Sequence, residues 1–368
     1  MCKKITCFLI FLLILPCIIY SKANDINTIY APPAQDTLAP VNANGPDLDE
    51  YILFKKEDFT GTSLNKKIWG FRKEGITEQG SIYLKENAQV KNGILYLITK
   101  RFEDKFSAVN ISTEKNPAYH FKYGYFEIKA KLPQTIGNVG AFWMQSPSMG
   151  ATFPVANPSI YGAEIDILEY SASNKDNLFH SLHWNGYDYS KGAKVTTQQN
   201  YMPGISNGFH TFGLEWTPKE YVIYVDNVEK VRTNQTISHV PEFIIIGCGT
   251  GGFGGNLNFI GPWPDTFAID YLKIYKRRPE VRLYGACNGY GWVSNGLQPG
   301  KYTTAQLISN GFFNDEASAV EIPKGWQMIA FDRDDCKGDF VTITADTPCL
   351  ETLLFNDKIS SIKIKTTE

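Results

Sequence analysis

Residues 162–170 of this protein read Gly-Ala-Glu-Ile-Asp-Ile-Leu-Glu-Tyr. The run alternates acidic and apolar residues with the period of two that is typical of a half-buried β-strand. Strict alternation would place Glu164 and Asp166 on one face of the strand and Glu169 on the other. One extra residue between Asp166 and Glu169, a β-bulge, would return Glu169 to the face of the other two acids. We therefore expect a bulged strand whose three carboxylates line one surface, with apolar residues packed beneath.

Three carboxylates this close repel one another, so stability alone does not favour them. Glycoside hydrolysis with retention gives them a use, because it needs a carboxylate nucleophile and a carboxylic acid about 5 Å apart. Crowding also separates their pKa values, which keeps one group ionised and another protonated. We assign Glu164 as nucleophile, Glu169 as general acid and then base, and Asp166 as the residue that hydrogen-bonds and tunes the pair. The alternatives are an exposed acidic strand face and a structural metal site.

The rest of the chain also has the pattern of an all-β protein. From about residue 50, short runs of β-branched and aromatic residues recur between Gly, Pro and Asn; examples are residues 93–98, 124–132, 221–225 and 267–275. Several alternate with period two, and long amphipathic helical patterns are absent. This pattern predicts a two-sheet antiparallel sandwich.

The N-terminus has the pattern of a secretory signal. Lys3 and Lys4 precede an apolar run over residues 7–20, and small residues follow at 21–23. We expect a signal peptide over residues 1–23 and a secreted or extracellular protein, with the periplasm or cell surface as alternatives. The apolar run is shorter than the roughly 20 residues that span a bilayer, so a membrane anchor is the weaker reading. Residues 24–48 are rich in Pro, Asn, Asp and Ala and are expected to form a linker.

Composition excludes some partners. The 368 residues carry a net charge of -2, from 36 basic and 38 acidic side chains, which gives no electrostatic reason to expect nucleic acid or an anionic membrane as a partner. The aromatic content of 14% exceeds what a core needs and suits a surface that stacks on sugars. We expect a monomer whose partner is a polysaccharide.

Four cysteines follow the predicted signal peptide: Cys248, Cys287, Cys336 and Cys349. In an oxidising compartment they allow three complete pairings, of which Cys336 with Cys349 closes the shortest loop and is favoured. Cys248 lies in an apolar run and is expected to be a buried free thiol. Their wide spacing, without an accompanying histidine, argues against a metal site.

The chain is expected to hold two domains, over residues 49–278 and 281–368. In the second, residues 313–322 resemble residues 355–364, 42 positions later. An internal period of this size indicates duplicated supersecondary units. We expect two similar four-stranded motifs that pack as a small β-domain.

The acidic segment resembles the signature of glycoside hydrolase family 16 in its bulged Glu-x-Asp-x-x-Glu form. Residues 123–133, 140–144, 209–218 and 269–275 are also similar to stretches of that family, in the same order. The similarity covers roughly residues 50 to 277. It implies a concanavalin A-like β-jelly-roll sandwich whose concave face forms an open cleft, and a secreted endo-glycosidase that needs no cofactor for catalysis.

The resemblance also implies substrate contacts. Trp143 and Trp184 are expected to stack on sugars near the cut bond, and His183 to hydrogen-bond substrate or the catalytic acid. Asn87 matches a polar cleft position, and Trp263 is a candidate for the cleft rim. For the tryptophans the alternative is the core, and for His183 it is a histidine satisfied within the sheet.

Relatives also carry a structural calcium ion on the convex face, whose acidic positions match Asp270 and Glu57. The second domain resembles the βγ-crystallin Greek-key domain. Its two calcium-binding motifs would supply oxygen ligands to a Ca²⁺ ion, with ordinary Asn-Asp turns as the alternative. The matching residues are Asn314, Asp315, Ser318, Asn356, Asp357 and Ser360.

The substrate stays open among three hypotheses. The resemblance favours a β-1,3- or β-1,3/1,4-glucan, but two tryptophans usual in laminarin-cutting relatives are missing before Glu164. A galactan is the second hypothesis, although the predicted cleft strands show few of the Arg and Lys that sulfated chains would favour. A non-catalytic carbohydrate-binding protein is the third, and the intact Glu164, Asp166 and Glu169 argue against it.

Overall fold

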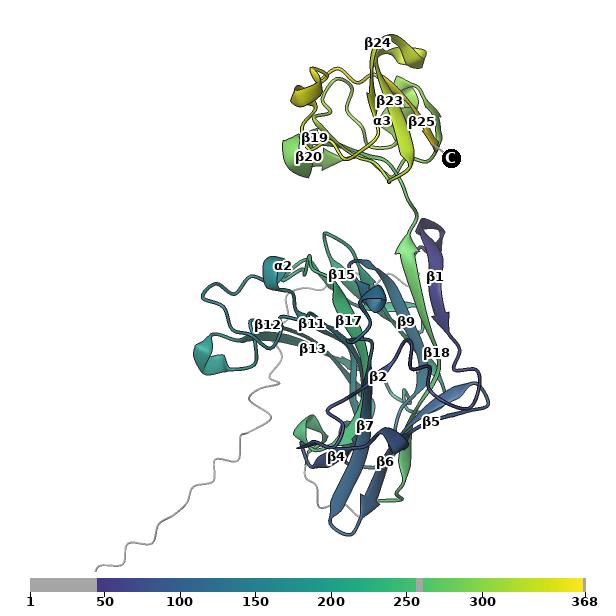
Figure 1. Ribbon diagram of the computed structural model, residues 1–368, viewed down its shortest axis with the longest axis vertical. Helices are drawn as coiled ribbons and strands as arrows, with labels where there is room; N and C mark the ends of the chain where they lie inside the picture. Colours follow the sequence, from purple (N-terminus) through teal and green to yellow (C-terminus); the bar gives the residue numbers. More distant parts are fainter. Residues whose placement is uncertain (1–44, 256–260, 367–368) are drawn as a thin grey trace, which may run out of the picture. The chain divides into compact units, whose positions relative to one another are not determined.

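The computed structural model describes residues 45–255 and 261–366. The predicted signal peptide and most of the predicted linker lie outside the described residues. The chain forms two compact units, one centred on Phe54–Ile274 and the other made of Asp47–Leu53 with Tyr275–Glu368 (Figure 1). No helix in the described part is long and apolar enough to cross a membrane.

The first unit is a β-sandwich of two antiparallel sheets, as the sequence predicts (Figure 1). We call the sheet that carries the three acids the site sheet and the other the backing sheet. In order across the sheet, the site sheet contains β2 (Gly70–Arg72), β7 (Lys105–Ser112), β17 (Glu242–Thr250), β10 (Asn138–Gln145), β11 (Glu164–Ser171), β12 (Asn177–Trp184) and β13 (Lys194–Tyr201). The backing sheet contains β5 (Ala88–Lys91), β6 (Ile94–Phe102), β18 (Asp265–Arg277), β9 (Gly124–Lys131), β14 (His210–Trp216), β15 (Tyr221–Val225) and β16 (Val228–Thr233).

Shorter elements occur along residues 48–254, of which η1 and the first residues of β1 belong to the second unit. β6 also pairs with β7, which joins the two sheets along one side and nearly closes the sandwich. The remaining strands are β1 (Tyr51–Glu57), β3 (Thr77–Glu78), β4 (Ser81–Tyr83) and β8 (His120–Phe121). The helical turns are α2 (Pro158–Tyr161) and the 3-10 helices η1 (Leu48–Glu50), η2 (Lys85–Asn87), η3 (Pro117–Tyr119), η4 (Ala172–Asn174), η5 (Tyr189–Lys191) and η6 (Gly252–Gly254).

Alternation along the strands builds the core between the sheets. On β11, the side chains of Ile165, Leu168 and Tyr170 are buried, and they face Phe212 and Leu214 of β14 within one cluster of apolar residues. Burial of large side chains such as these is the main favourable term in folding. The opposite face of the site sheet, which Figure 1 shows as the concave side, is left for polar side chains.

The second unit has two sheets that do not coincide with the two halves of its repeat. A three-stranded sheet contains β20 (Tyr290–Val293), β19 (Arg282–Ala286) and β22 (Ala319–Glu321); a four-stranded sheet contains β21 (Gly300–Tyr302), β25 (Ser361–Thr366), β23 (Trp326–Arg333) and β24 (Lys337–Ile343). The helices are η7 (Cys287–Gly289), α3 (Thr304–Ser309), η8 (Asp334–Cys336) and η9 (Leu350–Leu353). Because β21 belongs to the first half but pairs with β25 of the second, the halves are interlocked.

The repeat is visible in reciprocal side-chain contacts. Ser318 donates a hydrogen bond to Asp357 over 3.3 Å, and Ser360 donates one to Asp315 over 3.0 Å. Each half therefore supplies the serine that holds the aspartate of the other half.

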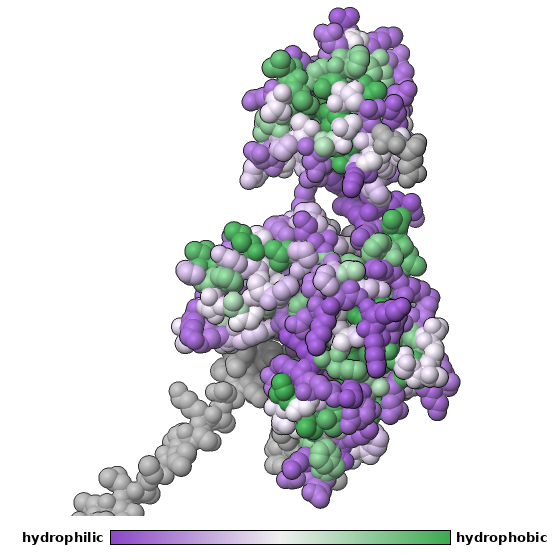
Figure 2. All heavy atoms as spheres, viewed as in Figure 1, coloured by the Kyte–Doolittle hydropathy of each residue, from purple (hydrophilic) through white to green (hydrophobic). Residues whose placement is uncertain are grey.

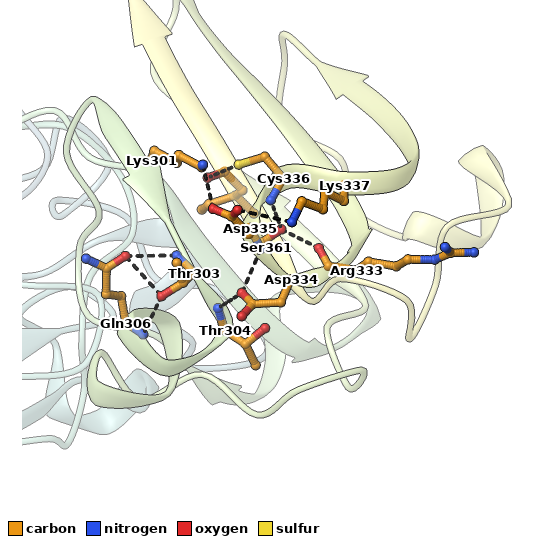
Figure 3. Close-up of polar contacts among 11 residues, drawn as sticks. Lys301, Thr303, Thr304, Gln306, Arg333, Asp334, Asp335, Cys336, Lys337 and Ser361 are labelled. Carbon is orange, nitrogen blue, oxygen red and sulfur yellow. Dashed lines mark hydrogen bonds and ion pairs between the residues drawn. The ribbon is translucent and has the colours of Figure 1, made fainter.

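The favoured disulfide pairing is wrong. The disulfide joins Cys287 to Cys349, while Cys336 is free and Cys248 is a buried free thiol as expected. Cys336 lies in the turn η8, where its N–H donates to Ser361 over 2.9 Å and its thiol to the carbonyl of Ile362 over 3.6 Å (Figure 3). This turn directs Cys336 toward β25, so the cysteine nearest to Cys349 in sequence is not its partner.

We predict that a nonreducing peptide map will contain a Cys287–Cys349 crosslink. The bridge closes a loop with a sequence separation of 62, so replacing either cysteine with Ser should destabilise the second unit by about 2–4 kcal/mol. Thermal unfolding of C349S measures this loss, with Cys336→Ser as the matched control that should leave stability nearly unchanged. A Cys336–Cys349 peptide in the map would contradict the structure.

Candidate active site

The register of β11 contains the extra residue that the sequence suggests. Toward β12, Asp166 pairs with Ser181 and Glu169 pairs with Phe179, so Ile167 and Leu168 lie opposite the single residue His180. The pairing with β10 shifts at the same point, where Phe142 is opposite Leu168 and Trp143 is opposite Asp166. The pairing of β11 with both neighbouring strands therefore shows one extra residue near Ile167.

The insertion places the three acids among polar neighbours on one face. Residues directly opposite each other on paired strands share a face of the sheet. Glu164 is opposite Gln145 on β10 and His183 on β12, and Asp166 is opposite Trp143 and Ser181. Beyond the shift, Glu169 accepts a hydrogen bond over 2.9 Å from the hydroxyl of the same Ser181. Ser181 thus lies opposite Asp166, before the shift, and donates a hydrogen bond to Glu169, after it.

His180 satisfies the backbone that the shift leaves unpaired. Its Nδ1 lies 2.8 Å from the carbonyl oxygen of Ile167, in the centre of the irregular segment. Burial lowers the pKa of His180 to about 4, so the ring is neutral at pH 7 and Nδ1 carries the proton that it donates. A buried carbonyl without a partner would be costly, so this bond stabilises the irregular strand.

Close packing sets where β11 begins. Gly162 has a φ of +76°, and a Cβ atom there would lie 2.2 Å from the Cβ of Ser146. Only glycine fits this turn, because it tolerates a positive φ and has no side chain to clash. The next residue, Ala163, donates its N–H to Oε1 of the buried Glu242 over 3.1 Å. The chain therefore enters β11 in one fixed register, with Glu164 as the first strand residue.

The carboxylate of Glu164 has two donors on one oxygen. Nε2 of Gln145 lies 2.8 Å from Oε2, and the hydroxyl of Tyr187 donates to the same atom. Nε2 of His183 lies 4.0 Å from Oε1 and 3.4 Å from Oδ2 of Asp166. Donors of this kind favour the charged form of a carboxylate.

The pKa values of the other two acids are raised. Burial and the neighbouring Glu164 keep the pKa of Asp166 well above its usual range. Burial, followed by the charge of Asp166, raises the pKa of Glu169 to about 8, while His183 and the Ser181 hydroxyl oppose the rise. One strand face therefore combines a hydrogen-bonded carboxylate, Glu164, with a carboxylic acid, Glu169, that can donate a proton at pH 7.

Two of the predicted substrate contacts lie beside the acids. Trp143 is partly exposed on this face, and the guanidinium of Arg72 lies 5.0 Å from its ring centre. His183 is partly exposed within reach of Glu164 and Asp166. Both side chains thus lie on the face that carries the three acids.

Two other predicted contacts, Asn87 and Trp263, pack against other residues of the fold. Asn87 is only 1% exposed, and its amide donates to Ser107 over 2.9 Å, so its nitrogen is committed to the fold. Trp263 packs edge-on against Phe106, with ring centres 5.1 Å apart. Contact of either residue with a substrate stays a prediction.

Trp184 follows His183 on the strand and so points to the opposite side. It lines a cavity of about 560 Å³ whose walls come from residues 156–159, 218–219 and 234–239, and none of the three acids contributes to it. An apolar surface patch lies over α2 beside this cavity, where Val155 and Ile160 are exposed (Figure 2).

The predicted metal ligands of the first unit are engaged with other groups. Asp270 forms an ion pair of 2.9 Å with Lys129, and Glu57 accepts the N–H of Phe59 over 3.0 Å. Within residues 45–255 and 261–366, the one cluster of three titratable ligand groups is Glu164, Asp166 and His183, whose ligand atoms lie within 4.8 Å of one another. The two donors on Glu164 and the raised pKa of the neighbouring Glu169 suit acid–base chemistry.

Sequence reasoning missed five residues that organise the site: Arg72, Gln145, Ser181, His180 and Tyr187. Arg72 donates to Oε1 of Gln145 over 2.6 Å, which directs the Gln145 amide toward Glu164. The alternation of β12 offered a signal for Ser181, because it lies two residues before His183 and so shares its face. Arg72 and Tyr187 had no such signal, since they come from distant segments.

Comparisons with known proteins agree with this geometry. The model of glycosyl hydrolases family 16 matches residues 77–245, which include β11 and both strands that flank it. Residues 77–245 of this protein therefore match glycoside hydrolase family 16. The protein is accordingly an O-glycosyl hydrolase.

Individual family 16 relatives are distant in sequence. A beta-glucanase of Rhodothermus marinus is 27% identical over 211 residues, which cover 52% of this chain and 71% of that protein. The endo-1,3-1,4-beta-glycanase ExsH of Rhizobium meliloti is 27% identical over 154 residues, which cover 42% of this chain and 30% of that protein. The laminarinase structure from Flavobacterium sp. UMI-01 aligns with a TM-score of 0.52 and 29% identity, covering 61% of this chain and all of that one.

We predict that His180 is required for the geometry of the irregular strand. Replacing it with Leu leaves the Ile167 carbonyl without a donor, which should lower the free energy of unfolding by about 1–3 kcal/mol and reduce activity. Replacing it with Asn keeps a donor near the position of Nδ1 and should lose less of both. Chemical denaturation and activity assays compare the two variants; equal losses would show that the hydrogen bond is not what matters.

Proposed function

We propose that this protein is an endo-acting hydrolase that cleaves a β-1,3- or β-1,3/1,4-glucan with retention of configuration. The proposal depends on a difference between two acids of one strand. The carboxylate of Glu164 accepts two hydrogen bonds, whereas the carboxyl of Glu169 has a raised pKa of about 8 and holds a proton at pH 7. The names of the relatives, a beta-glucanase and a laminarinase among them, favour a β-glucan over a galactan.

The proposed mechanism is double displacement. The Glu164 carboxylate attacks the anomeric carbon, the glycosidic C–O bond breaks, and Glu169 gives its proton to the departing oxygen. Water then attacks the glycosyl-enzyme ester, Glu169 takes the proton of that water, and the electron pair of the broken C–O bond returns to Glu164. Burial and the neighbouring Glu164 raise the pKa of Asp166, which disfavours a second negative charge beside Glu164.

Two further side chains suit a sugar substrate. Trp143 offers a partly exposed indole face beside Asp166, and such rings match the apolar faces of pyranoses. His183 can donate a hydrogen bond from Nε2 on the other side of the acids. We propose that these residues bind the sugar units next to the cleaved bond.

The experiment is digestion of laminarin, lichenan, agarose and β-1,3-galactan, with the first product anomer observed by NMR. We expect β-glucan fragments of several sizes and initial β-anomers. Glu164→Ser should lose activity by roughly 10³-fold or more while remaining folded, and the exposed Glu103→Ser serves as the control. Initial α-anomers would contradict double displacement, and cleavage of galactans alone would contradict the glucan assignment.

The pH dependence tests the role of Glu169. Its raised pKa means that the group is protonated below about pH 8 and loses its proton above, so kcat/KM should fall tenfold per pH unit on the alkaline side. Burial also raises the pKa of Glu242 to about 8, so Glu242→Gln is the matched control and should keep the alkaline limb. Glu169→Gln should lose it, and azide should restore part of its turnover on activated glycosides. If the alkaline limb persists in E169Q but disappears in E242Q, the titrating group is Glu242 and the assignment of Glu169 is wrong.

We further propose that the second unit is a βγ-crystallin-like Greek-key domain that binds Ca²⁺. Asp315 and Asp357 have positive φ values of 58° and 53°, and each accepts a hydrogen bond from the serine of the other half. The buried Oδ1 atom of Asn356 has no hydrogen-bond partner, which suits an oxygen ligand of a hard cation.

We predict that chelation will destabilise the second unit of the full-length protein. EGTA should lower its melting transition by several degrees, because a ligand at 100 times its Kd contributes about 2.7 kcal/mol. Asp315→Ala with Asp357→Ala should abolish the response, whereas the exposed Asp339→Ala should keep it. A transition that does not respond to calcium or EGTA would remove the proposal.

We also propose that the protein is secreted. The Cys287–Cys349 disulfide supports this location, because such bonds persist in oxidising compartments. The peptide map that locates the disulfide also tests this, since the mature chain should begin at Asn24.

A further inference from the structure

The two oxygens of the Glu164 carboxylate are not equivalent. Within the described residues, hydrogen bonds reach only Oε2, from Nε2 of Gln145 at 2.8 Å and from the hydroxyl of Tyr187. Oε1 faces the His183 ring at 4.0 Å, which is beyond hydrogen-bond distance. Gln145 also donates to the Tyr187 oxygen, so the two donors are connected. One carboxylate oxygen is therefore held and the other is left open.

Tyr187 is held in place by a loop packed on another loop. It follows β12, and the preceding Asn185 accepts the N–H of Phe153 over 2.8 Å and donates to the carbonyl of Gly192 over 3.1 Å. A Cβ atom on Gly186, which has a φ of +78°, would lie 2.7 Å from Oγ1 of Thr152. The segment before α2 thus fixes the backbone that precedes Tyr187, and the bond from Asn185 to Gly192 holds the backbone that follows it.

Gln145 is oriented by Arg72. The guanidinium only donates, so the 2.6 Å bond from Nη2 requires the oxygen of the Gln145 amide on that side and its nitrogen toward Glu164. Arg72 is in turn packed over the rings of Trp143 and Phe243, at 5.0 and 5.9 Å. The donor on Glu164 is therefore set by side chains from β2, β10 and β17.

We propose that Tyr187 and Gln145 form a clamp on Oε2 of Glu164 that selects Oε1 as the attacking atom and accelerates breakdown of the glycosyl-enzyme. The inference rests on the double displacement proposed above. When Oε1 bonds to the anomeric carbon, the glycosidic C–O bond breaks with protonation by Glu169, and Oε2 becomes the carbonyl oxygen of the ester. When water attacks, the C–Oε1 bond breaks, its electron pair returns to the carboxylate, and Glu169 takes the water proton.

The direction of the effect follows from charge. Hydrogen bonds to an ionised acceptor are stronger than those to a neutral ester. The clamp therefore stabilises Glu164 as the leaving carboxylate of the second step, and it lowers its nucleophilicity in the first. Removing the Tyr187 hydroxyl should slow deglycosylation and leave glycosylation unchanged or slightly faster.

Pre-steady-state kinetics with 2,4-dinitrophenyl β-laminaribioside test this. In Tyr187→Phe we expect kcat to fall roughly tenfold or more, KM to fall with it, kcat/KM to change less than about threefold, and a burst of dinitrophenol near one equivalent per enzyme. Gln145→Leu should give the same pattern, which keeps the test available if one variant folds poorly. Tyr189→Phe, in the same loop, is the matched control and should behave as the wild type.

Two outcomes would overturn the clamp. A fall in kcat/KM without a burst would place Tyr187 in the first step or in substrate binding, and unchanged kinetics in both variants would give the two donors no role. The anomer released by the wild type separates this from the proposed function. If the wild type inverts the anomeric configuration, the double displacement itself is wrong. If it retains the configuration but the variants give no burst, only the clamp is wrong.

Discussion

The carbonyl of Ile167 and the imidazole of His180 form the contact on which the site depends. An inserted residue turns β11 between Asp166 and Glu169, and such an insertion leaves backbone groups without ladder partners. His180 fills that position with a side chain buried in the sandwich. The cost of the irregularity is thus offset within the core, and the acids on the other face need not contribute to it.

Burial then gives the three carboxyl groups different properties. They share a face and a low-dielectric setting, so they cannot all be charged. Gln145 and Tyr187 bring donors to Glu164, while Asp166 has a buried oxygen without a hydrogen-bond partner and Glu169 has only the Ser181 hydroxyl. The hydrogen-bond donors are therefore concentrated on Glu164, and burial raises the pKa values of Asp166 and Glu169. The assignment of roles follows from hydrogen bonds that neighbouring strands and loops supply.

The segment between β10 and β11 departs in sequence from the pattern of laminarin-cutting relatives. It lacks the tryptophans expected of laminarin-cutting relatives, and it packs instead on the loop that carries Tyr187. This segment thus helps to position Tyr187, which contacts Glu164. The second unit shows a similar dependence on context, because each half of its repeat supplies the serine that binds the aspartate of the other.

Local patterns in the sequence determined the all-β class, the sandwich, the β11 insertion and the free thiol of Cys248, because alternation and apolar runs report which face of a strand is buried. The three acids could be named for the same reason, since they belong to one strand. The tertiary structure alone decided what depends on distant segments meeting. Arg72, Gln145 and Tyr187 converge on Glu164 from three places in the chain, Trp184 turns into a separate cavity, and Cys349 meets Cys287 across 62 residues while its nearer neighbour Cys336 is held by β25. Proximity along the chain carries no information about such contacts, because they are set by how the sheets and loops pack.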